Sequence, residues 1–220
     1  MKVKYGRDQK IKGDLTENFD ANYAFLEKAL NRSGDIVKNI FYMGKSIEMS
    51  AGKKVAVIYV DGMTDADMIE DFVIRPLLRK FSEKTGQELL SYVENHVMET
   101  VDWKEDESFE EILTDILSGN TLVLVESCPK AIILSTKKYP SRGVGETQQE
   151  MVIRGPKDSF TENMRINTAL IRRRIRDPRL KMEHTMVGER SKTDLAIVYM
   201  DDLVRPELLE KIRNKVKKMS

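Results

Sequence analysis

The sequence has almost none of the residues that metal sites and disulfides need. Its 220 residues include one cysteine, Cys128, and two histidines, His96 and His184. A lone cysteine forms no internal disulfide, which fits a reducing compartment. Neither histidine belongs to a metal-spaced motif, and no basic partner lies near Cys128 in the sequence. We therefore expect no metal, no cofactor and no cysteine-based catalysis.

Long apolar stretches and an excess of one charge are also missing. The longest apolar runs, Val55–Val60 and Thr121–Val125, are far shorter than the roughly 20 residues that span a bilayer. The N-terminus lacks the apolar segment of a secretory signal. Thirty-seven basic and 36 acidic residues leave a net charge of +1, so no overall field favours nucleic acid or an anionic membrane. These absences predict a soluble, cytoplasmic chain without a membrane span.

Amphipathic helices and short apolar strands alternate along the chain. Apolar residues at helical spacing predict helices over 19–30, from about 64, and over 85–97, 108–117, 159–176 and from 206. Strands are predicted over 36–43, 54–62, 121–126, 130–136, 180–188 and 193–200. Pro76 should bend or divide the second helix. The interleaving predicts an α/β fold of mixed α+β layers.

One internal repeat suggests how the chain divides. Val55–Glu70 aligns without gaps on Leu195–Glu210, and each segment has the pattern of a buried strand, an acidic turn and an amphipathic helix. A chance match stays open as the alternative. A Gly-rich linker between the copies predicts two small subdomains, each with a short sheet packed by helices. The predicted boundaries are 1–32 for the tail and first helix, 33–139 for subdomain 1, 140–149 for the linker and 150–220 for subdomain 2.

The arginine-rich stretch Arg154–Pro178 raises the possibility of a basic binding helix. Ser159 and Glu162 have the spacing of a capping box, so the helix should begin at Ser159. At 100° per residue, one apolar stripe forms the buried face and three arginines lie opposite it, toward solvent. The stripe consists of Phe160, Met164, Ile171 and Ile175, and the opposite arginines are Arg165, Arg172 and Arg176. Since arginines surround the axis without interleaved aromatic residues, we expect no nucleic-acid binding.

Three polar residues fall within the predicted buried face of this helix: Asn163, Asn167 and Arg174. A buried amide or charge needs a partner. One interpretation is a structural polar network that ties the helix to neighbouring backbone. The other is a polar ligand site in a cleft between the subdomains, which makes these three candidate ligand-binding residues. Both interpretations stay open.

Acidic residues follow both repeated strands. Asp61 comes after the first strand, and Asp201 with Asp202 comes after the second. Carboxylates at the carboxyl ends of strands could hold Mg²⁺ or an ammonium group. The favoured alternative is helix capping, because Thr64 and Asp67 resemble a capping box and acidic residues suit a first turn. Asp61 and Asp201 are kept as candidate ligand-binding residues.

The same arginine-rich stretch carries a long motif, R-G-P-x-x-x-F-x-E-x-x-R-x-N-x-x-L-I-R-R-R-I, from Arg154 to Ile175. The strand and D-G turn at Val55–Gly62 and the S-G-N-T turn at Ser118–Thr121 accompany it. Together these stretches resemble the N-terminal soluble region of bacterial spore germinant receptor A subunits, from about Ser33 onward. The motif residues singled out on this resemblance are Arg154, Gly155, Pro156, Arg165 and Arg172.

The resemblance implies a non-enzymatic role in nutrient sensing and receptor assembly. A subunits of that family join other subunits in the inner membrane of dormant spores, and the receptors respond to amino acids, sugars or nucleosides. The implied partners of this chain are therefore other germinant receptor subunits and a small nutrient germinant. A membrane is implied for the full-length parent. Two α/β subdomains are implied for the soluble region, of which the second is expected to be incomplete in this chain. The family has no catalytic residues to carry over.

Two other functions stay open on the sequence alone. An enzyme acting on a phosphorylated or nucleotide small molecule could use the acidic strand ends, although the sequence has no phosphate-binding loop. An adaptor for membrane surfaces or nucleic acid could use the arginine-rich helix. The predicted facing of that helix also has a consequence for stability. Arg174→Ala should cost several kcal/mol by breaking a buried pair, and Arg172→Ala should be nearly neutral.

Overall fold

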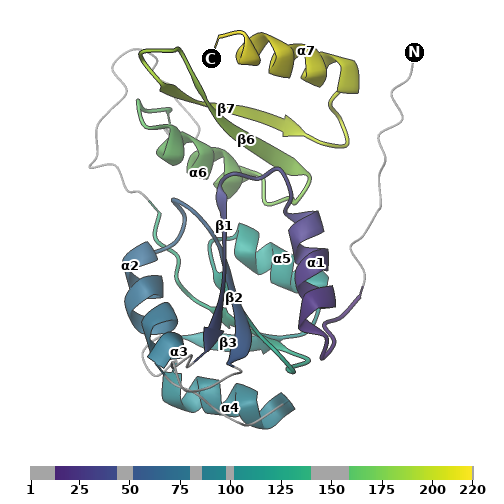
Figure 1. Cartoon of the computed structure of the whole chain (residues 1–220), viewed down its shortest axis with the longest axis vertical. Coiled ribbons are helices and arrows are strands. Elements are labelled where there is room, and N and C mark those ends of the chain that lie inside the picture. Colours follow the sequence, from purple (N-terminus) through teal and green to yellow (C-terminus); the bar gives the residue numbers. More distant parts are fainter. Residues whose placement is uncertain (1–12, 44–51, 80–85, 98–101, 140–158, 220) are drawn as a thin grey trace, which may run out of the picture.

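Five antiparallel strands form the larger sheet, in the order β1-β2-β4-β5-β3 (Figure 1). The computed structural model describes residues 13–43, 52–79, 86–97, 102–139 and 159–219. The strands are β1 (Ile36–Met43), β2 (Lys53–Val60), β3 (Trp103–Asp106), β4 (Thr121–Val125) and β5 (Ala131–Leu134). The sequence pattern predicted four of them to within two residues at each end. The predicted linker at 140–149 lies outside the described residues.

β3 is the strand that the sequence pattern missed. It lies in an acidic segment without apolar alternation, and its four residues are exposed or half-buried. It pairs antiparallel with the fully buried β5 and forms one edge of the sheet. Charged side chains are typical of edge strands because they discourage pairing with other chains.

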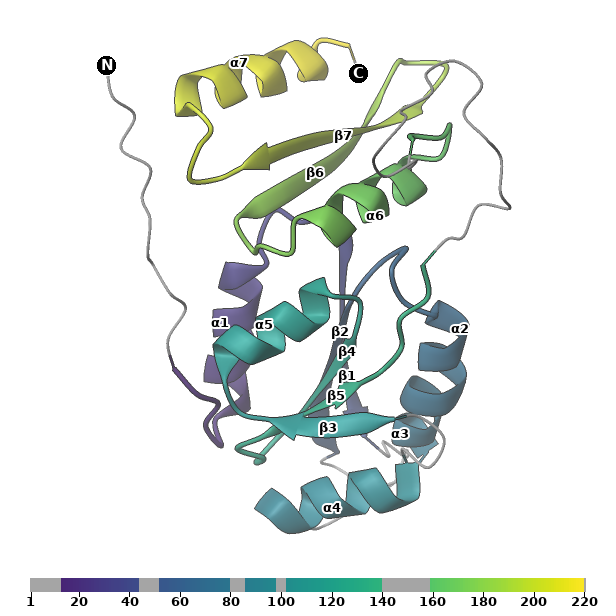
Figure 2. The same ribbon diagram turned by 180° about the vertical axis from the view of Figure 1, so that it is seen from behind.

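Helices cover both faces of the larger sheet (Figures 1 and 2). They are α1 (Phe19–Ala29), α2 (Ala66–Ile69), α3 (Arg75–Arg79), α4 (Gly86–Val97) and α5 (Phe109–Leu117). α1 and α5 pack on one face, where they bury Ala56 and Ile58 of β2. α2, α3 and α4 pack on the other face, over Val55 and Val57. Burial on both faces explains the continuous apolar run of β2.

The helix that follows β2 is divided, as Pro76 predicts. α2 continues through a π-helical turn, Glu70–Ile74, into α3. Proline lacks an N–H group, so Pro76 cannot satisfy the carbonyl four residues earlier in an α-helical pattern. A widened turn directly before it accommodates this defect.

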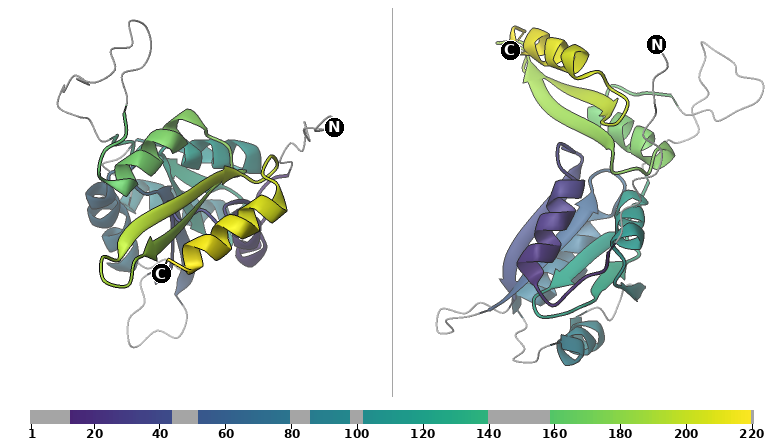
Figure 3. Two further views of the ribbon diagram at one scale, coloured as in Figure 1. Left: turned by 90° about the horizontal axis from the view of Figure 1, so that it is seen from above. Right: turned by 90° about the vertical axis from the view of Figure 1, so that its right-hand side faces the viewer.

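The smaller sheet is a hairpin of β6 (Leu180–Val187) and β7 (Thr193–Met200). α6 (Met164–Arg174) lies between this hairpin and the end of the larger sheet, and α7 (Pro206–Lys217) lies on the hairpin's far side (Figure 3). We call residues 13–139 the large unit and residues 159–219 the small unit. The whole is a mixed α+β fold, as predicted.

The internal repeat extends beyond the segment found in the sequence. The large unit contains α1-β1-β2-α2, and the small unit contains α6-β6-β7-α7 in the same order. The two hairpins also share their register, since Ile36 pairs with Val60 and Leu180 with Met200 at the corresponding ends. Shared order and register support duplication of a helix-hairpin-helix unit over the chance match.

The first copy begins with a hydrogen-bonded motif, T-E-N-x-x-x-N. The Thr16 N–H donates to Asn22 Oδ1 at 3.1 Å, and the Asn22 amide donates back to the Thr16 carbonyl at 2.6 Å. Asn18 Oδ1 accepts from the Ala21 N–H at 3.0 Å and caps α1. Asn22 therefore closes the loop before α1, and Asn18 caps the first turn of the helix.

The second copy repeats the motif atom for atom. The Thr161 N–H donates to Asn167 Oδ1 at 2.7 Å, and the Asn167 amide donates back to the Thr161 carbonyl at 2.7 Å. Asn163 Oδ1 accepts from the Ile166 N–H at 3.3 Å and caps α6. The predicted capping box at Ser159 is therefore wrong, because the residues before Met164 form this loop instead of a helical turn.

Asn22→Ala should lower the free energy of unfolding by about 1–3 kcal/mol, because it removes both hydrogen bonds between the Asn22 side chain and the Thr16 backbone. Asn22 is 2% exposed, whereas Asn167 is half-buried, so Asn167→Ala should cost less, about 1 kcal/mol. Urea unfolding followed by circular dichroism measures both. Exposed Asn31 is the control, and an Asn22→Ala loss no larger than that of Asn31→Ala would refute the structural role of the motif.

Candidate functional site at the junction of the two units

A buried ion pair joins the two units. Arg172 on α6 is 0% exposed, and Asp35, directly before β1, is 2% exposed. The guanidinium donates from Nε to Asp35 Oδ2 at 2.8 Å and from Nη2 to Asp35 Oδ1 at 3.1 Å. It also donates to the carbonyls of Asp177 and Leu180, each at 3.1 Å. A two-pronged pair fixes orientation as well as distance, so the junction has a defined geometry.

Backbone hydrogen bonds continue the junction beside this pair. The Met182 N–H on β6 donates to the Arg32 carbonyl at 3.1 Å, and the Gly34 N–H donates to the Met182 carbonyl at 2.8 Å. The loop after α1 thus forms a short parallel bridge with β6. A Cβ on Gly34 would lie 2.9 Å from His184 Cγ. Glycine at this position therefore leaves room for the His184 side chain beside the bridge.

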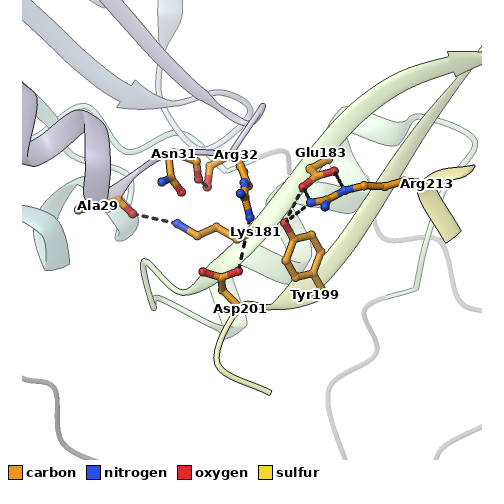
Figure 4. Close-up of polar contacts among 9 residues, drawn as sticks. Ala29, Asn31, Arg32, Lys181, Glu183, Tyr199, Asp201 and Arg213 are labelled. Carbon is orange, nitrogen blue, oxygen red and sulfur yellow. Dashed lines mark hydrogen bonds and ion pairs between the residues drawn. The ribbon is translucent and has the colours of Figure 1, made fainter. Parts of the chain in front are cut away.

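A buried lysine crosses the junction (Figure 4). Lys181 on β6 is 4% exposed, and its Nζ donates to the Ala29 carbonyl at the end of α1, at 3.0 Å. A cation is favourable at the C-terminus of a helix. Burial lowers the pKa of the Lys181 amino group, while the nearby Asp201 carboxylate acts in the opposite direction.

Two ion pairs lie at the rim of the junction. Arg165 on α6 pairs with Asp61, which follows β2. Arg32 pairs with Asp201, which follows β7, at 3.9 Å (Figure 4). All four side chains are about one third to one half exposed, so solvent weakens both attractions. The carboxyl ends of both repeated strands therefore carry charge pairs to this junction.

A second polar cluster ties α7 to the smaller sheet (Figure 4). Arg213 Nε on α7 donates to Glu183 Oε2 at 2.8 Å, and the Tyr199 hydroxyl donates to Glu183 Oε1 at 2.5 Å. The Arg213 guanidinium also lies 5.9 Å from the centre of the Tyr199 ring. Hydrogen bonds from Arg213 and then Tyr199 hold the pKa of Glu183 below its ordinary value.

Arg213→Met should raise the pKa of Glu183 and weaken the docking of α7 by about 1 kcal/mol. Because the folded pKa is depressed, this carboxylate stabilises the fold above its ordinary pKa of 4.5, and its contribution is lost as the pH falls through the folded pKa. The Glu183 carboxyl resonance measures the titration, and hydrogen exchange over 206–217 measures the docking. Lys211→Met is the matched control, and an unchanged Glu183 titration in Arg213→Met would contradict the assignment.

The five predicted ligand-binding residues do not lie at one place. Asp61 and Asp201 are at the rim of the junction. Asn163 and Asn167 hold the loop before α6, as the repeated motif requires, and this supports the structural interpretation of both asparagines. Arg174 is exposed near the end of α6. A shared ligand-binding role for these five residues stays a prediction.

The predicted facing of α6 is wrong. Phe160 is 65% exposed and Ile175 is 40% exposed, whereas Arg172, predicted to face solvent, is buried against Asp35. Arg174, predicted to be buried, is exposed. The reason is that Phe160 and Ile175 lie outside the helix, and that α6 faces the large unit as well as its own hairpin. The buried residues of α6 are Thr168, Ala169 and Arg172.

Helix capping, the favoured interpretation of the first acidic turn, is confirmed with a different cap. Asp65 Oδ1 accepts from the Met68 N–H at 3.2 Å, while the Thr64 hydroxyl donates to the Val60 carbonyl. Lys138 pairs with Asp65 at 2.8 Å, and its hydrogen bond lowers the pKa of that carboxyl. Among the motif residues, Arg165 and Arg172 both lie at the junction, and Arg154, Gly155 and Pro156 are outside the described residues.

Comparison with known proteins decides the family. Residues 24–220 match the model of the Bacillus/Clostridium GerA spore germination protein family. This chain belongs to that family. The matched residues include α6 and every residue of the junction described above.

Relatives in Bacillus subtilis (strain 168) agree with this assignment. "Stage V sporulation protein AF" is 34% identical over 84% of this chain and 38% of the relative's length. "Spore germination protein B1" is 28% identical over 96% of this chain and 41% of its own length. The chain thus spans about two fifths of the length of these relatives.

A solved structure shares the fold. The N-terminal domain of the A subunit of the Bacillus megaterium spore germinant receptor GerK3 matches with a TM-score of 0.72 and 20% identity, over 94% of this chain and 74% of that chain. The likeness supports the mixed α+β architecture. Within the part of the chain that the structure describes, no helix has both the length and the apolar character to cross a membrane.

Proposed function

We propose that this chain is a non-enzymatic domain of a spore germinant receptor, which joins receptor subunits and relays nutrient sensing as one rigid body. The observation that carries the proposal is the buried Arg172–Asp35 pair between the two units. A hinged binding domain needs an interface that can open, whereas separating this pair would expose an arginine and an aspartate from a dry site at high cost. Rigid coupling suits a part that transmits force or position between subunits.

The non-enzymatic part of the proposal rests on the chemistry of the site. Over the residues that the structure describes, no cluster of three or more His, Cys, Asp or Glu side chains could hold a metal ion. Cys128 is 1% exposed, so it is not placed to attack a substrate. The alternative, an enzyme for phosphorylated or nucleotide substrates, receives no support from this arrangement.

A disulfide across the junction tests the rigid-body proposal. A Cβ on Gly34 would lie 3.2 Å from His184 Cβ, so a shift of a few tenths of an ångström brings the pair to the roughly 3.5–4.5 Å of a disulfide. Gly34→Cys/His184→Cys, when oxidised, should bind the soluble parts of its partner subunits as tightly as when reduced. If oxidation abolished binding and reduction restored it, the junction would have to move and the proposal would be wrong.

A small germinant is a second candidate ligand, favoured by the two charge pairs at the junction rim. The Arg32–Asp201 pair is loose, at 3.9 Å, and about half exposed. An amino acid carries the matching charges, since its carboxylate can pair with arginine and its ammonium group with aspartate. We place such a ligand between these two side chains, with Arg165 and Asp61 as the other available pair.

Titration of isotope-labelled protein with amino acids, sugars and nucleosides tests this ligand. An active germinant should shift the amide resonances around Arg32 and Asp201 in a saturable way, and Arg32→Ala/Asp201→Ala should abolish the shifts. Arg190→Ala/Asp194→Ala removes the same two residue types from the exposed end of the hairpin and is the matched control. No shifts across the panel would leave subunit assembly as the function.

A further inference from the structure

The near-zero net charge of the chain conceals a strong separation of charge. From residue 13 to 139 the sequence has 14 lysines and arginines against 23 aspartates and glutamates, a net charge of −9. From 159 to 219 it has 15 against 9, a net charge of +6. The small unit lies at one end of the molecule (Figure 1), so the protein is electrically polar along its length. An anionic surface would attract the small unit and repel the large one.

α7 forms the extreme end of the basic unit, opposite α4 (Figures 1 and 2). One side of α7 packs on the smaller sheet through Leu209 and Arg213. The neighbouring side carries an apolar stripe at helical spacing that is open to solvent. Its members and their exposures are Leu208 52%, Ile212 38% and, just after the helix, Met219 54%.

Lysines border this stripe on its outer side. Lys211, Lys215 and Lys218 lie next to it on the helix surface, and all three are exposed. From 206 to 218 the sequence has five basic residues against two acidic ones. An apolar stripe bordered by lysines is the pattern of a helix that lies in the headgroup region of a bilayer.

We infer that the outer face of α7 binds the surface of an anionic phospholipid bilayer. Leu208, Ile212 and Met219 enter the boundary between headgroups and acyl chains, and the three lysines pair with lipid phosphates. The charge separation orients the molecule, because the acidic large unit is repelled from the same surface. The large unit and the junction then point away from the membrane.

Two other occupants fit the observations less well. Nucleic acid would also attract the lysines, but its phosphate surface offers nothing to an apolar stripe, and the stripe has no aromatic residue for stacking on bases. A second copy of the chain would cover the stripe, but it would bring two lysine-bordered faces of the same charge together.

Sedimentation of the chain with vesicles tests the inference. The protein should bind vesicles of phosphatidylglycerol and phosphatidylethanolamine at low salt, and should not bind phosphatidylcholine vesicles. Raising the salt should release it, because screening shortens the reach of the lysine charges. No binding to the anionic vesicles at low salt would overturn the inference.

Matched variants locate the binding surface. Lys211→Gln/Lys215→Gln should weaken binding roughly 10- to 30-fold, as expected for two lysines beside an anionic leaflet. Lys28→Gln/Lys137→Gln removes the same charge from exposed positions of the large unit and should leave binding unchanged. Leu208→Gln/Ile212→Gln keeps the charge and should weaken binding on the order of 10-fold by removing the apolar contact. Equal losses in the two lysine pairs would overturn the inference.

Two further measurements separate the other occupants. Tighter binding to a short DNA duplex than to the anionic vesicles would assign the lysines to nucleic acid. A dimer in sedimentation velocity that Leu208→Gln/Ile212→Gln converts to a monomer would assign the stripe to a second copy. Either result overturns the inference. Both are independent of the disulfide and titration experiments on the junction.

Discussion

Arg172→Ala should lower the free energy of unfolding by about 3–5 kcal/mol, because it leaves the Asp35 carboxylate buried without its partner. The substitution also removes the donors of two backbone carbonyls, those of Asp177 and Leu180. Circular dichroism in urea measures the loss. Arg174→Ala is the matched control on the same helix, and it should cost less than about 1 kcal/mol because its side chain is exposed.

The same variant should uncouple the two units. Trp103 is the only tryptophan in the sequence and lies on β3 of the large unit, so its fluorescence reports on that unit alone. In the wild type, its unfolding curve should coincide with that from circular dichroism, as for a single cooperative transition. In Arg172→Ala the two curves should separate. A larger loss of unfolding free energy in Arg174→Ala than in Arg172→Ala would contradict the structure. It would support the sequence prediction that Arg174 is buried and Arg172 faces solvent.

A double-mutant cycle measures the interaction energy between Arg172 and Asp35 separately from the contribution of each residue. Asp35→Ala should also be strongly destabilising, since it leaves the Arg172 guanidinium buried without a counter-charge. The double variant should lose less than the sum of the two single losses, because no isolated buried charge remains. Strict additivity would mean that the two residues act independently, despite the 2.8 Å hydrogen bond between them.

Elements with a strong local signal could be predicted from the sequence. β1, β4, α4 and α5 are within about one residue of their predicted bounds, since apolar periodicity sets each one almost alone. β3 was missed because what forms it is pairing with β5, which a sequence pattern does not contain. The start of α6 was predicted wrongly because two candidate caps, Ser159 and Asn163, lie within five residues of each other. The hydrogen bonds between the Asn167 side chain and the Thr161 backbone close a loop there, so the helix begins after Asn163.

The junction could not be predicted for a different reason. Arg172 and Asp35 are 137 residues apart in sequence, and several arginines on α6 were equally plausible partners for any buried acid. Lys181 donates to the backbone carbonyl of Ala29. Every residue has a backbone carbonyl, so the sequence of α1 does not indicate this contact. The predicted buried face of α6 was wrong because the helix packs against both the large unit and its own hairpin. No single apolar stripe therefore defines its buried side.

The sequence does contain a signal for the roles of Asn163 and Asn167, and it lies outside the aligned strands. Residues 16–22 and 161–167 share T-E-N-x-x-x-N. The shared motif indicates capping and loop closure for Asn163 and Asn167, the roles that Asn18 and Asn22 have in the first copy. The motif does not indicate the burial of Arg172, because α1 and α6 bury different faces. The buried residues of α1 are Phe19, Asn22 and Leu26.

Gly62→Val should lower the free energy of unfolding by about 2–4 kcal/mol, from backbone strain and from contact with α6. Gly62 has φ +78°, a left-handed conformation that a β-branched residue rarely adopts. A Cβ there would also lie 3.2 Å from the Arg165 carbonyl and 3.3 Å from the Ala169 Cβ. Urea unfolding measures the total loss, and hydrogen exchange over 164–174 reports whether α6 separates from the large unit.

Gly62→Asn separates the two causes. Asparagine tolerates the left-handed region better than valine, but its Cβ makes the same approach to α6. Its loss should therefore fall between zero and that of Gly62→Val, at about 1–2 kcal/mol, with exchange over α6 still faster than in the wild type. A Gly62→Asn protein as stable as the wild type would show that strain alone requires glycine here. The close packing of α6 on the turn after β2 would then contribute nothing to holding the two units together.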